Sequence, residues 1–369
     1  MSLNVGIVGL PNVGKSTIFQ AITAAPAEAA NYPFCTIEPN VGIVSVPDTR
    51  VDKITNYIKP QKVIRAVMEF VDIAGLVKGA SRGEGLGNQF LGHIRQVSAI
   101  AHVVRCFEDS DVVHVDGKID PINDIEVINM ELAFADLETV DKRIANLSKM
   151  LKSHDKKVKG QALASQPILE RLKTVLEEGK AARTLNLDEE ELETIKDLHL
   201  ITLKEMLYVC NVDEDSITED NDHVKKVREF AANEGAKVLT ICGKIESEIS
   251  QLETDEDKKE FLADMGLEES GLDQLIKAGY ETLGLNTYFT AGEKEVRAWT
   301  FPKGYKAPQC AGIIHTDFER GFIKAEVYHC DDLFEYQSES KIKEAGKIRM
   351  EGKEYVMKDG DVVHFRFNV

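Results

Sequence analysis

Residues Gly9 to Thr17 read Gly-Leu-Pro-Asn-Val-Gly-Lys-Ser-Thr and directly follow the apolar run Leu3 to Val8. This order predicts a buried strand that ends at the glycines, and a helix that begins at Lys15 with its N-terminal amides pointing at phosphate. Gly9 and Gly14 would let the backbone wrap closely around a β-phosphate. The alternative, a glycine turn that merely joins strand to helix, is disfavoured by the complete spacing. We therefore expect the chain to bind a nucleoside triphosphate.

The residues of this loop have separate expected roles. Lys15 would reach the β- and γ-phosphate oxygens, where it would act in catalysis, and the Ser16 hydroxyl would ligate Mg²⁺. The remaining loop residues assigned to nucleotide binding are Asn12, Val13, Gly14 and Thr17.

A second metal-binding segment, Val71-Asp72-Ile73-Ala74-Gly75, follows a β-branched run. Asp72 would hold Mg²⁺ through water, and the Gly75 amide would sense the γ-phosphate. Between the two segments, the proline-containing stretch Tyr32 to Asn40 is a candidate first switch. Its Thr36 hydroxyl would close onto Mg²⁺ when the γ-phosphate is present. An ordinary loop is the alternative interpretation.

The residues after Gly75 bear on the rate of hydrolysis. The run from Lys78 to Gly87 contains four glycines, which is typical of a switch that is ordered in only one nucleotide state. Leu76 occupies the position where many GTPases carry the glutamine that orients the attacking water. Hydrolysis should therefore be slow or should recruit other groups, such as a monovalent cation (K⁺) with Asn12 as a ligand, or His114.

Base recognition is expected in the segment Asn211-Val212-Asp213-Glu214, which follows an apolar strand. Guanine-specific proteins of this architecture carry Asn-Lys-x-Asp there. Val212 replaces the lysine that stacks on the base, and Glu214 is one methylene longer than the aspartate that pairs with guanine. These changes weaken the case for strict guanine selection without establishing adenine.

Composition bounds the class of protein. The 369 residues are 43% hydrophobic and 29% charged, which suits an ordinary globular protein with two or three domains. The N-terminus is expected to be a core strand rather than a signal peptide, and no apolar stretch is long enough to span a bilayer. Six scattered cysteines without a Cys-x-x-Cys pair favour a reducing cytoplasm over structural zinc.

The net charge of −18 argues against non-specific binding to nucleic acid, but the charge is uneven. The window from Lys142 to Arg183 holds eleven basic and four acidic residues, a net charge of +7. This asymmetry suggests a polyanionic partner such as RNA, and a solvated helix face explains it equally well.

Apolar runs and helical stretches alternate along the first part of the chain, which predicts a parallel sheet with helices on both faces. The expected strands are Leu3–Val8, Val67–Ile73, Ile100–Phe107, Leu203–Val209 and Ala236–Ile241. From about 124 to 200 the spacing becomes helical and predicts an antiparallel helical hairpin, broken at Gly160 or at Gln166-Pro167. His102, inside an apolar strand, is expected to be a core residue.

From about Gly284 the pattern changes to short strands with turns, which predicts a small mixed α/β domain. The expected strands are Thr287–Thr290, Val296–Phe301, Gly312–His315 and Ile323–Val327, followed by a hairpin of Tyr355–Met357 and Val362–Phe367 through an Asp-Gly turn. The expected domains are 1–283, which includes the insertion, and 284–367.

The phosphate-binding loop, the segment Asn-Tyr-Pro-Phe-Cys-Thr-Ile-Glu-Pro-Asn and the segment Asp-Ile-Ala-Gly-Leu-Val-Lys-Gly-Ala-Ser resemble the Obg-related P-loop proteins of the TRAFAC class. The Asn-Val-Asp-Glu variant, the helical insertion and the C-terminal Tyr-Phe-Thr-Ala-Gly and His-Thr-Asp-Phe-Glu-Arg-Gly-Phe segments narrow the resemblance. Nearly the whole chain is similar to the YchF-type Obg-like ATPases.

The resemblance implies an Obg-type G domain with a coiled-coil insertion and a C-terminal β-grasp TGS domain. It implies slow, potassium-assisted hydrolysis of ATP in preference to GTP, with Mg²⁺ as cofactor, and association with the ribosome, with the large subunit as the expected partner. Leu76 matches the hydrophobic residue of the family. The family roles transfer to Asn12 through Thr17, Thr36, Asp72, Gly75, Asn211 and Glu214. A GTPase with an altered base motif, or a ribosome-binding scaffold with a structural nucleotide, is the alternative.

Overall fold

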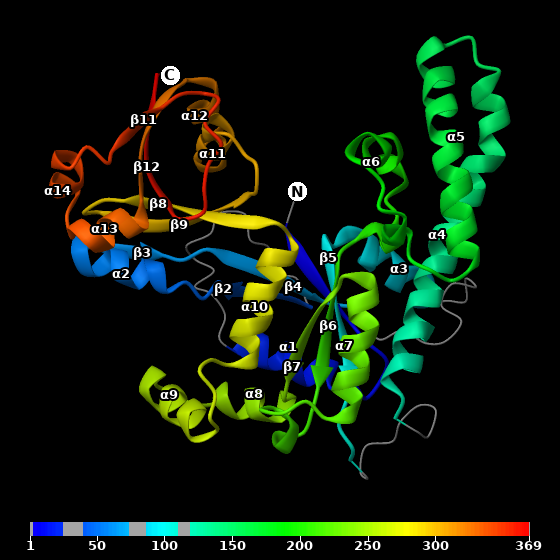
Figure 1. Ribbon diagram of the computed structural model, residues 1–369, viewed down its shortest axis with the longest axis horizontal. Helices are drawn as coiled ribbons and strands as arrows, with labels where there is room; N and C mark the ends of the chain where they lie inside the picture. The colour runs from blue at the N-terminus through cyan, green and yellow to red at the C-terminus, as the bar shows by residue number, and fades with distance from the viewer. Residues whose placement is uncertain (1–2, 25–39, 74–85, 110–118, 369) are drawn as a thin grey trace. The chain divides into compact units, whose positions relative to one another are not determined.

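The structure is a computed structural model that describes residues 3–24, 40–73, 86–109 and 119–368, with backbone only for 86–89. Its described residues fall into two compact units (Figure 1). The first unit comprises those of Met1–Ala25, Glu38–Gly42 and Glu69–Leu275. The second comprises those of Ile43–Met68 and Ile276–Val369. Among all the described residues of both units, no helix is both long and apolar enough to cross a membrane.

The first sheet has the strand order β2-β4-β1-β5-β6-β7, and the strands from β4 to β7 run parallel. Its strands are β1 (Asn4–Val8), β2 (Val41–Ser45), β4 (Val67–Asp72), β5 (Ala99–Arg105), β6 (Met206–Asn211) and β7 (Lys237–Ile241). The expected parallel sheet is confirmed. The fourth predicted strand is shifted along the chain, because residues Ile201–Leu203 form a short 3₁₀ helix before β6 begins.

The helices that accompany this sheet are α1 (Lys15–Ala24), α3 (Leu86–Gln96), α4 (Pro121–Leu151), α5 (Lys156–Glu177), α6 (Glu189–Ile195), α7 (Asp222–Glu234), α8 (Gly243–Ile249), α9 (Asp255–Asp264) and α10 (Gly271–Thr282). Short 3₁₀ turns lie at Ala182–Leu185, Lys196–Leu198, Ile201–Leu203 and Glu214–Ser216. Helices α4 and α7 pack against the central strands, and α1 packs against α8. His102 on β5 is fully buried, and burial lowers its pKa to about 3, so the imidazole is a neutral core group as expected.

The predicted helical hairpin is confirmed as α4 and α5, but the position of its break was wrong. Gly160 and Pro167 both lie inside α5, and the chain turns between Leu151 and Lys156. The Asp155 carboxylate accepts the backbone N–H of Lys157 and caps α5 there. Packing of α4 on α5 offsets the hydrogen bond that Pro167 removes. The apolar seam between the helices contains Val140, Leu147, Ala162, Leu169, Leu172 and Leu176.

The second sheet has the strand order β11-β10-β12-β8-β9-β3. Its strands are β3 (Lys62–Ile64), β8 (Leu285–Ala291), β9 (Glu295–Pro302), β10 (Phe322–His329), β11 (Arg349–Glu351) and β12 (Asp361–Phe367). The helices of this unit are α2 (Thr49–Ile58), α11 (Ala307–Ile314), α12 (Thr316–Arg320), α13 (Cys330–Tyr336) and α14 (Glu339–Glu344). The sheet is mixed: β3 pairs parallel with β9, β12 pairs parallel with β8, and the other recorded pairs are antiparallel.

Two C-terminal predictions were wrong. Residues Gly312–His315 are not a strand: Ala307-Pro308 begins α11, because proline favours the first turn of a helix. The expected C-terminal hairpin is also absent from the described residues. The Asp359-Gly360 turn forms, with Gly360 at φ +85°, but β12 pairs with β10 and β8, and Val356 makes only an isolated bridge to Lys306.

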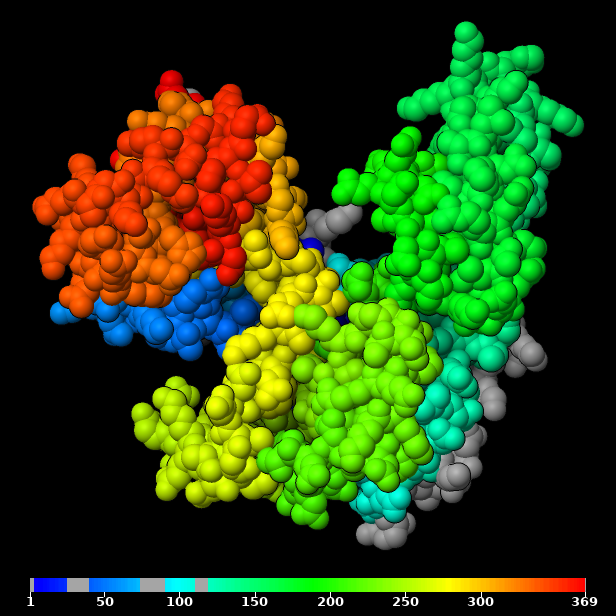
Figure 2. All heavy atoms as spheres, in the orientation of Figure 1, coloured from blue at the N-terminus to red at the C-terminus, as the bar shows by residue number. Residues whose placement is uncertain are grey.

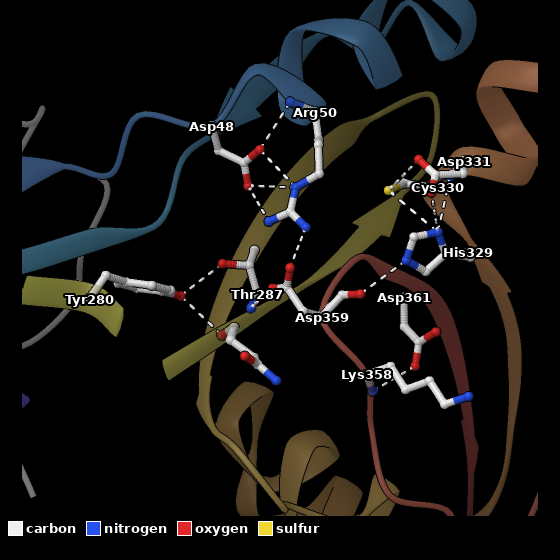
Figure 3. A network of polar contacts seen from close by, with 11 residues as sticks. Asp48, Arg50, Tyr280, Thr287, His329, Cys330, Asp331, Lys358, Asp359 and Asp361 are labelled. Atoms are coloured by element: carbon white, nitrogen blue, oxygen red, sulfur yellow. Dashed lines mark hydrogen bonds and ion pairs between the residues drawn. The ribbon is translucent and has the colours of Figure 1, made fainter. Parts of the chain in front are cut away.

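A segment between the phosphate-binding loop and Asp72 belongs to the second unit, which the sequence did not indicate. Arg50 of α2 donates to both carboxylate oxygens of Asp48 and, at 2.5 Å, to Asp359 (Figure 3). The same Asp359 carboxylate accepts the backbone N–H of Thr287 at 2.7 Å. Helix α2 and strand β3 are thus tied into the C-terminal sheet.

Candidate nucleotide-binding site

The phosphate-binding loop follows β1 and leads into α1, which begins at Lys15 as predicted. Gly9 and Gly14 are required by close contacts. A Cβ on Gly9 would lie 2.8 Å from the carbonyl oxygen of Val103. A Cβ on Gly14, which has φ +90°, would lie 2.0 Å from Nδ2 of Asn211. Any side chain at Gly14 would therefore displace the base-recognition segment from the loop.

Lys15 and Asp72 meet at the carboxyl edge of the sheet. β1 and β4 pair in parallel register, so that Asp72 ends its strand beside Ile7 and the start of the loop. The ammonium of Lys15 donates directly to Asp72 Oδ1, and Lys15 as a residue is only 8% exposed. Carboxylate and hydroxyl oxygens are the ligands that Mg²⁺ prefers, so Asp72 and the exposed Ser16 at the start of α1 fit that ion.

Asn211 joins the base-recognition segment to the phosphate-binding loop. Its Nδ2 donates to the carbonyl oxygen of Val13 at 2.9 Å, and its Oδ1 accepts the backbone N–H of Gly243 at 3.0 Å. Asn211 is only 5% exposed, so these bonds form in a region of low dielectric, where losing them is costly. The loops that follow β1, β6 and β7 are therefore held together by one amide side chain.

A cavity of about 710 Å³ opens beside these loops. Its lining includes Asn12, Gly14, Thr17, Asn211, Val212 and Glu214, all of which were predicted from the sequence. Val13, the other predicted loop residue, is buried and contributes to the site through its carbonyl oxygen, which accepts the hydrogen bond from Asn211. The size and the position of the cavity suit a purine base and its ribose.

One wall of this cavity, formed by Phe107, Glu108 and Asp109 after β5, was not predicted from the sequence. The buried side chain of Arg105 holds that segment in place through hydrogen bonds to its backbone. Its side chain is 1% exposed, donates to the carbonyl oxygens of Phe107 and Asp109 at 3.2 Å, and lies 4.6 Å from the centre of the Phe107 ring. An arginine that ends an otherwise apolar strand was the available signal.

Lys244, to which the sequence assigned no role, lies at the rim of the cavity. Its ammonium lies 2.5 Å from Glu214 Oε1, and the hydrogen bond to that carboxylate raises the pKa of Lys244. Both side chains are largely exposed, so the pair contributes little to stability. In this structure the pair turns Oε1 of Glu214 toward Lys244.

Thr36, Gly75, Leu76, His114 and the glycine-rich run from 78 to 85 lie outside the described residues. The expected roles of these residues stay predictions. The remaining predicted ligands of nucleotide and metal lie in the described part of the site.

One other group of possible metal ligands occurs among the described residues, at His329, Cys330 and Asp331. His329 Nδ1 accepts the backbone N–H of Asp331 at 3.3 Å, and Nε2 lies 3.0 Å from the carbonyl oxygen of Asp359 (Figure 3). An imidazole that accepts at Nδ1 and donates from Nε2 satisfies both contacts. His329 therefore acts as a helix cap for α13, which argues against a metal site.

Comparison with known proteins agrees with this arrangement. Residues 4–158 match the family model described as 50S ribosome-binding GTPase, and residues 285–368 match the YchF GTPase C-terminal model, described as a protein of unknown function. The ribosome-binding ATPase YchF of Bacillus subtilis (strain 168) is 60% identical over the whole of both chains. Its namesake in Escherichia coli O157:H7 is 54% identical, again over the whole of both.

A solved structure of the YchF GTPase of Schizosaccharomyces pombe is 40% identical, with a TM-score of 0.89 over 99% of this chain and 98% of the other. The match in sequence extends through both the nucleotide site and the C-terminal sheet. The chain belongs to the YchF family of P-loop proteins.

Proposed function

We propose that this protein binds ATP with Mg²⁺ and hydrolyses it slowly to ADP and phosphate, as a nucleotide-dependent switch linked to translation or to the stress response. The observation that carries the proposal is the convergence of Lys15, Asp72 and Asn211 on one phosphate-binding loop. The curated bacterial relatives carry the name ATPase.

In this proposal the loop amides and Lys15 hold the β- and γ-phosphates. Ser16, Thr36 and Asp72 would hold Mg²⁺, which would neutralise charge that develops on the transferred phosphoryl group. The Gly75 amide reports the γ-phosphate. Since Leu76 can orient no water, turnover is slow. Asn12 would serve as a ligand of K⁺, which would supply positive charge near the phosphates, and His114 is the alternative source of the assistance that a glutamine gives elsewhere.

The preference for ATP over GTP rests on the base-recognition segment. Val212 has no ammonium to place over a base, and Phe107 offers an aromatic wall of the cavity on which any purine can stack. Glu214 Oε1 accepts a hydrogen bond from Lys244, and the Glu214 side chain is one methylene longer than the aspartate that pairs with guanine, so a two-point contact with guanine would be misplaced. The Schizosaccharomyces pombe relative is named a GTPase, so GTP hydrolysis is the alternative within the same site.

The proposed macromolecular partner is the ribosome, through its large subunit, in the cytoplasm. The bacterial relatives are named ribosome-binding, and the N-terminal family model is described as 50S ribosome-binding. We also propose that residues 284–367 form a TGS domain, and that the helical insertion makes the contact with RNA.

The test is phosphate release from ATP and GTP by the full chain, in K⁺ and in Na⁺ buffers. Asp72→Asn should abolish the Mg²⁺-dependent rate, and Lys15→Ala should abolish nucleotide binding. A scaffold with a structural nucleotide predicts instead no turnover above background. It also predicts that Lys15→Ala loses nucleotide but binds ribosomes as well as the unmodified protein does.

A further inference from the structure

The basic residues of the helical insertion divide into two groups by their partners. Along the flanks of the hairpin, the cations are paired with carboxylates. The flank pairs are Lys142–Glu138, Arg143–Asp197, Arg171–Glu191, Lys173–Asp141, Lys180–Glu178, Arg183–Glu234 and Lys196–Glu193. The excess of positive charge in this window is therefore largely neutralised on the flanks.

The second group surrounds the turn between α4 and α5, and we call it the tip lysines. Its members are Lys149, Lys152, Lys156, Lys157 and Lys159. All five are exposed, and none has an ion-pair partner among the described residues. The one carboxylate in the turn, Asp155, already accepts the backbone N–H of Lys157 as the cap of α5. The unneutralised charge of the insertion is thus concentrated at its tip.

Local helix energetics do not favour this placement. Lys156, Lys157 and Lys159 lie in the first turn of α5, which contains no acidic residue. A cation near a helix N-terminus opposes the helix dipole and so destabilises the helix, most strongly at low salt. A sequence shaped only by helix stability would carry Asp or Glu there, as α6 does with three glutamates in its first turn.

The tip is held on a packed stem. Leu147 of α4 and Ala162 of α5 are buried in the seam close to the turn, and Met150 and Leu151 pack against it. In Figure 2 the far end of the hairpin stands clear of α6, with its side chains extending into open space. The five ammonium groups are therefore presented together on a defined scaffold.

We propose that the tip of the α4–α5 hairpin is the RNA-contacting surface of this protein, and that its five lysines bind the phosphate backbone of ribosomal RNA. The proposal rests on the ribosome association proposed above. Lysine ammonium groups bind phosphates as point charges without reading sequence, so the tip positions the protein rather than selecting a base sequence. An acidic protein segment is the competing partner, and the experiment distinguishes the two.

The mechanism makes a quantitative prediction, because each phosphate that a cation neutralises releases counterions. The slope of log Kobs against log salt changes by about 0.9 for each phosphate of a duplex and about 0.7 for each of a single strand. Loss of five such contacts should make the slope shallower by about 3.5–4.5.

The test compares two full-length variants with the same change in charge. The tip variant replaces Lys149, Lys152, Lys156, Lys157 and Lys159 by Gln. The flank variant replaces Lys142, Arg143, Lys173, Lys180 and Lys196 by Gln. Binding to purified ribosomes and to deproteinised ribosomal RNA is measured across a salt series, with calorimetric ATP binding as the check that each variant is folded.

The tip variant should bind ATP normally, bind ribosomes and RNA at least tenfold more weakly, and show the shallower slope, while the flank variant stays close to the unmodified protein. Equal losses in both variants, or an unchanged slope in the tip variant, would overturn the proposal. A tip variant that loses ribosome binding but keeps RNA binding would assign the surface to an acidic protein. Failure of the unmodified protein to bind ribosomes would refute the proposed association itself.

Discussion

The side-chain amide of Asn211 donates to the main-chain carbonyl of Val13 at 2.9 Å and so links the base-recognition segment to the phosphate-binding loop. The two residues are almost two hundred positions apart in the chain. Because the Asn211 oxygen also accepts from Gly243, one side chain sets the distance between the phosphate and base parts of the site.

Gly14→Ala tests this link. The added methyl would lie 2.0 Å from Asn211 Nδ2, at a backbone φ of +90° that L-residues rarely adopt. We expect ATP affinity to fall at least tenfold, as measured by calorimetry. The matched control is Gly160→Ala in α5, where nothing lies within 4 Å of the new methyl. It should leave ATP binding unchanged and raise stability by about 0.5–1 kcal/mol.

The buried Glu246 should make the stability of the folded protein depend on pH. This buried carboxylate of α8 accepts the backbone N–H groups of Gly271 and Leu272 at the start of α10, and burial raises its pKa to about 7. The folded protein therefore binds more protons than the unfolded chain between the ordinary pKa of 4.5 and about 7. The contribution of Glu246 is fully present below 4.5 and is lost as pH rises through 7, by about 3 kcal/mol.

Glu246→Gln should remove this part of the pH dependence. The quantity to measure is the melting temperature of both proteins from pH 4.5 to 8. As pH rises, the melting temperature of the variant should increase relative to that of the unmodified protein. Parallel curves for the two proteins would show that Glu246 does not titrate in this range.

Lys204 should stabilise the end of α3, the helix that follows the glycine-rich run. Its ammonium donates to the carbonyl oxygens of Ile94 and Arg95 at 2.8 Å and to that of Val97, and burial lowers the pKa of Lys204 to about 8. Lys204→Met leaves these carbonyls without their donor and should cost about 2–4 kcal/mol in denaturant unfolding. Lys225→Met, at an exposed lysine of α7, serves as the control and should change stability little.

Arg50 and Asp359 should be coupled in the stability of the C-terminal unit (Figure 3). Arg50→Ala leaves Asp48 and Asp359 without their shared cation, at an expected cost of about 1.5–3 kcal/mol for the lost charged hydrogen bonds. Asp359→Asn in the Arg50→Ala background should cost less than it does alone, which a double-mutant cycle measures. Additive losses would mean that the pair does not hold α2 to the Asp359-Gly360 turn.

The sequence was sufficient to predict the parallel sheet, the phosphate-binding loop and the helical hairpin, because each depends on local spacing. Gly14 and Lys15 could be assigned since their roles follow from the loop itself. The wall formed by Arg105 and Phe107 could not, because it depends on which strand ends lie side by side. The C-terminal errors have a similar cause: short apolar runs such as Gly312–His315 suit either a helix or a strand, and only packing decides.

The membership of α2 and β3 in the C-terminal unit was also beyond the reach of the sequence. Strand β3 has only three residues, and its partner β9 lies more than two hundred positions away. A strand pairing between residues so far apart in the chain produces no periodic pattern in the sequence from which it could be predicted.

Calorimetric titration of the nucleotide-free protein with non-hydrolysable analogues of ATP and GTP, in the presence of Mg²⁺, tests the proposed preference for ATP most directly. We predict that the ATP analogue binds at least tenfold more tightly than the GTP analogue, and that Lys15→Ala binds neither. Tighter binding of the GTP analogue would contradict this prediction, and would identify the Asn211 to Glu214 segment as a guanine reader.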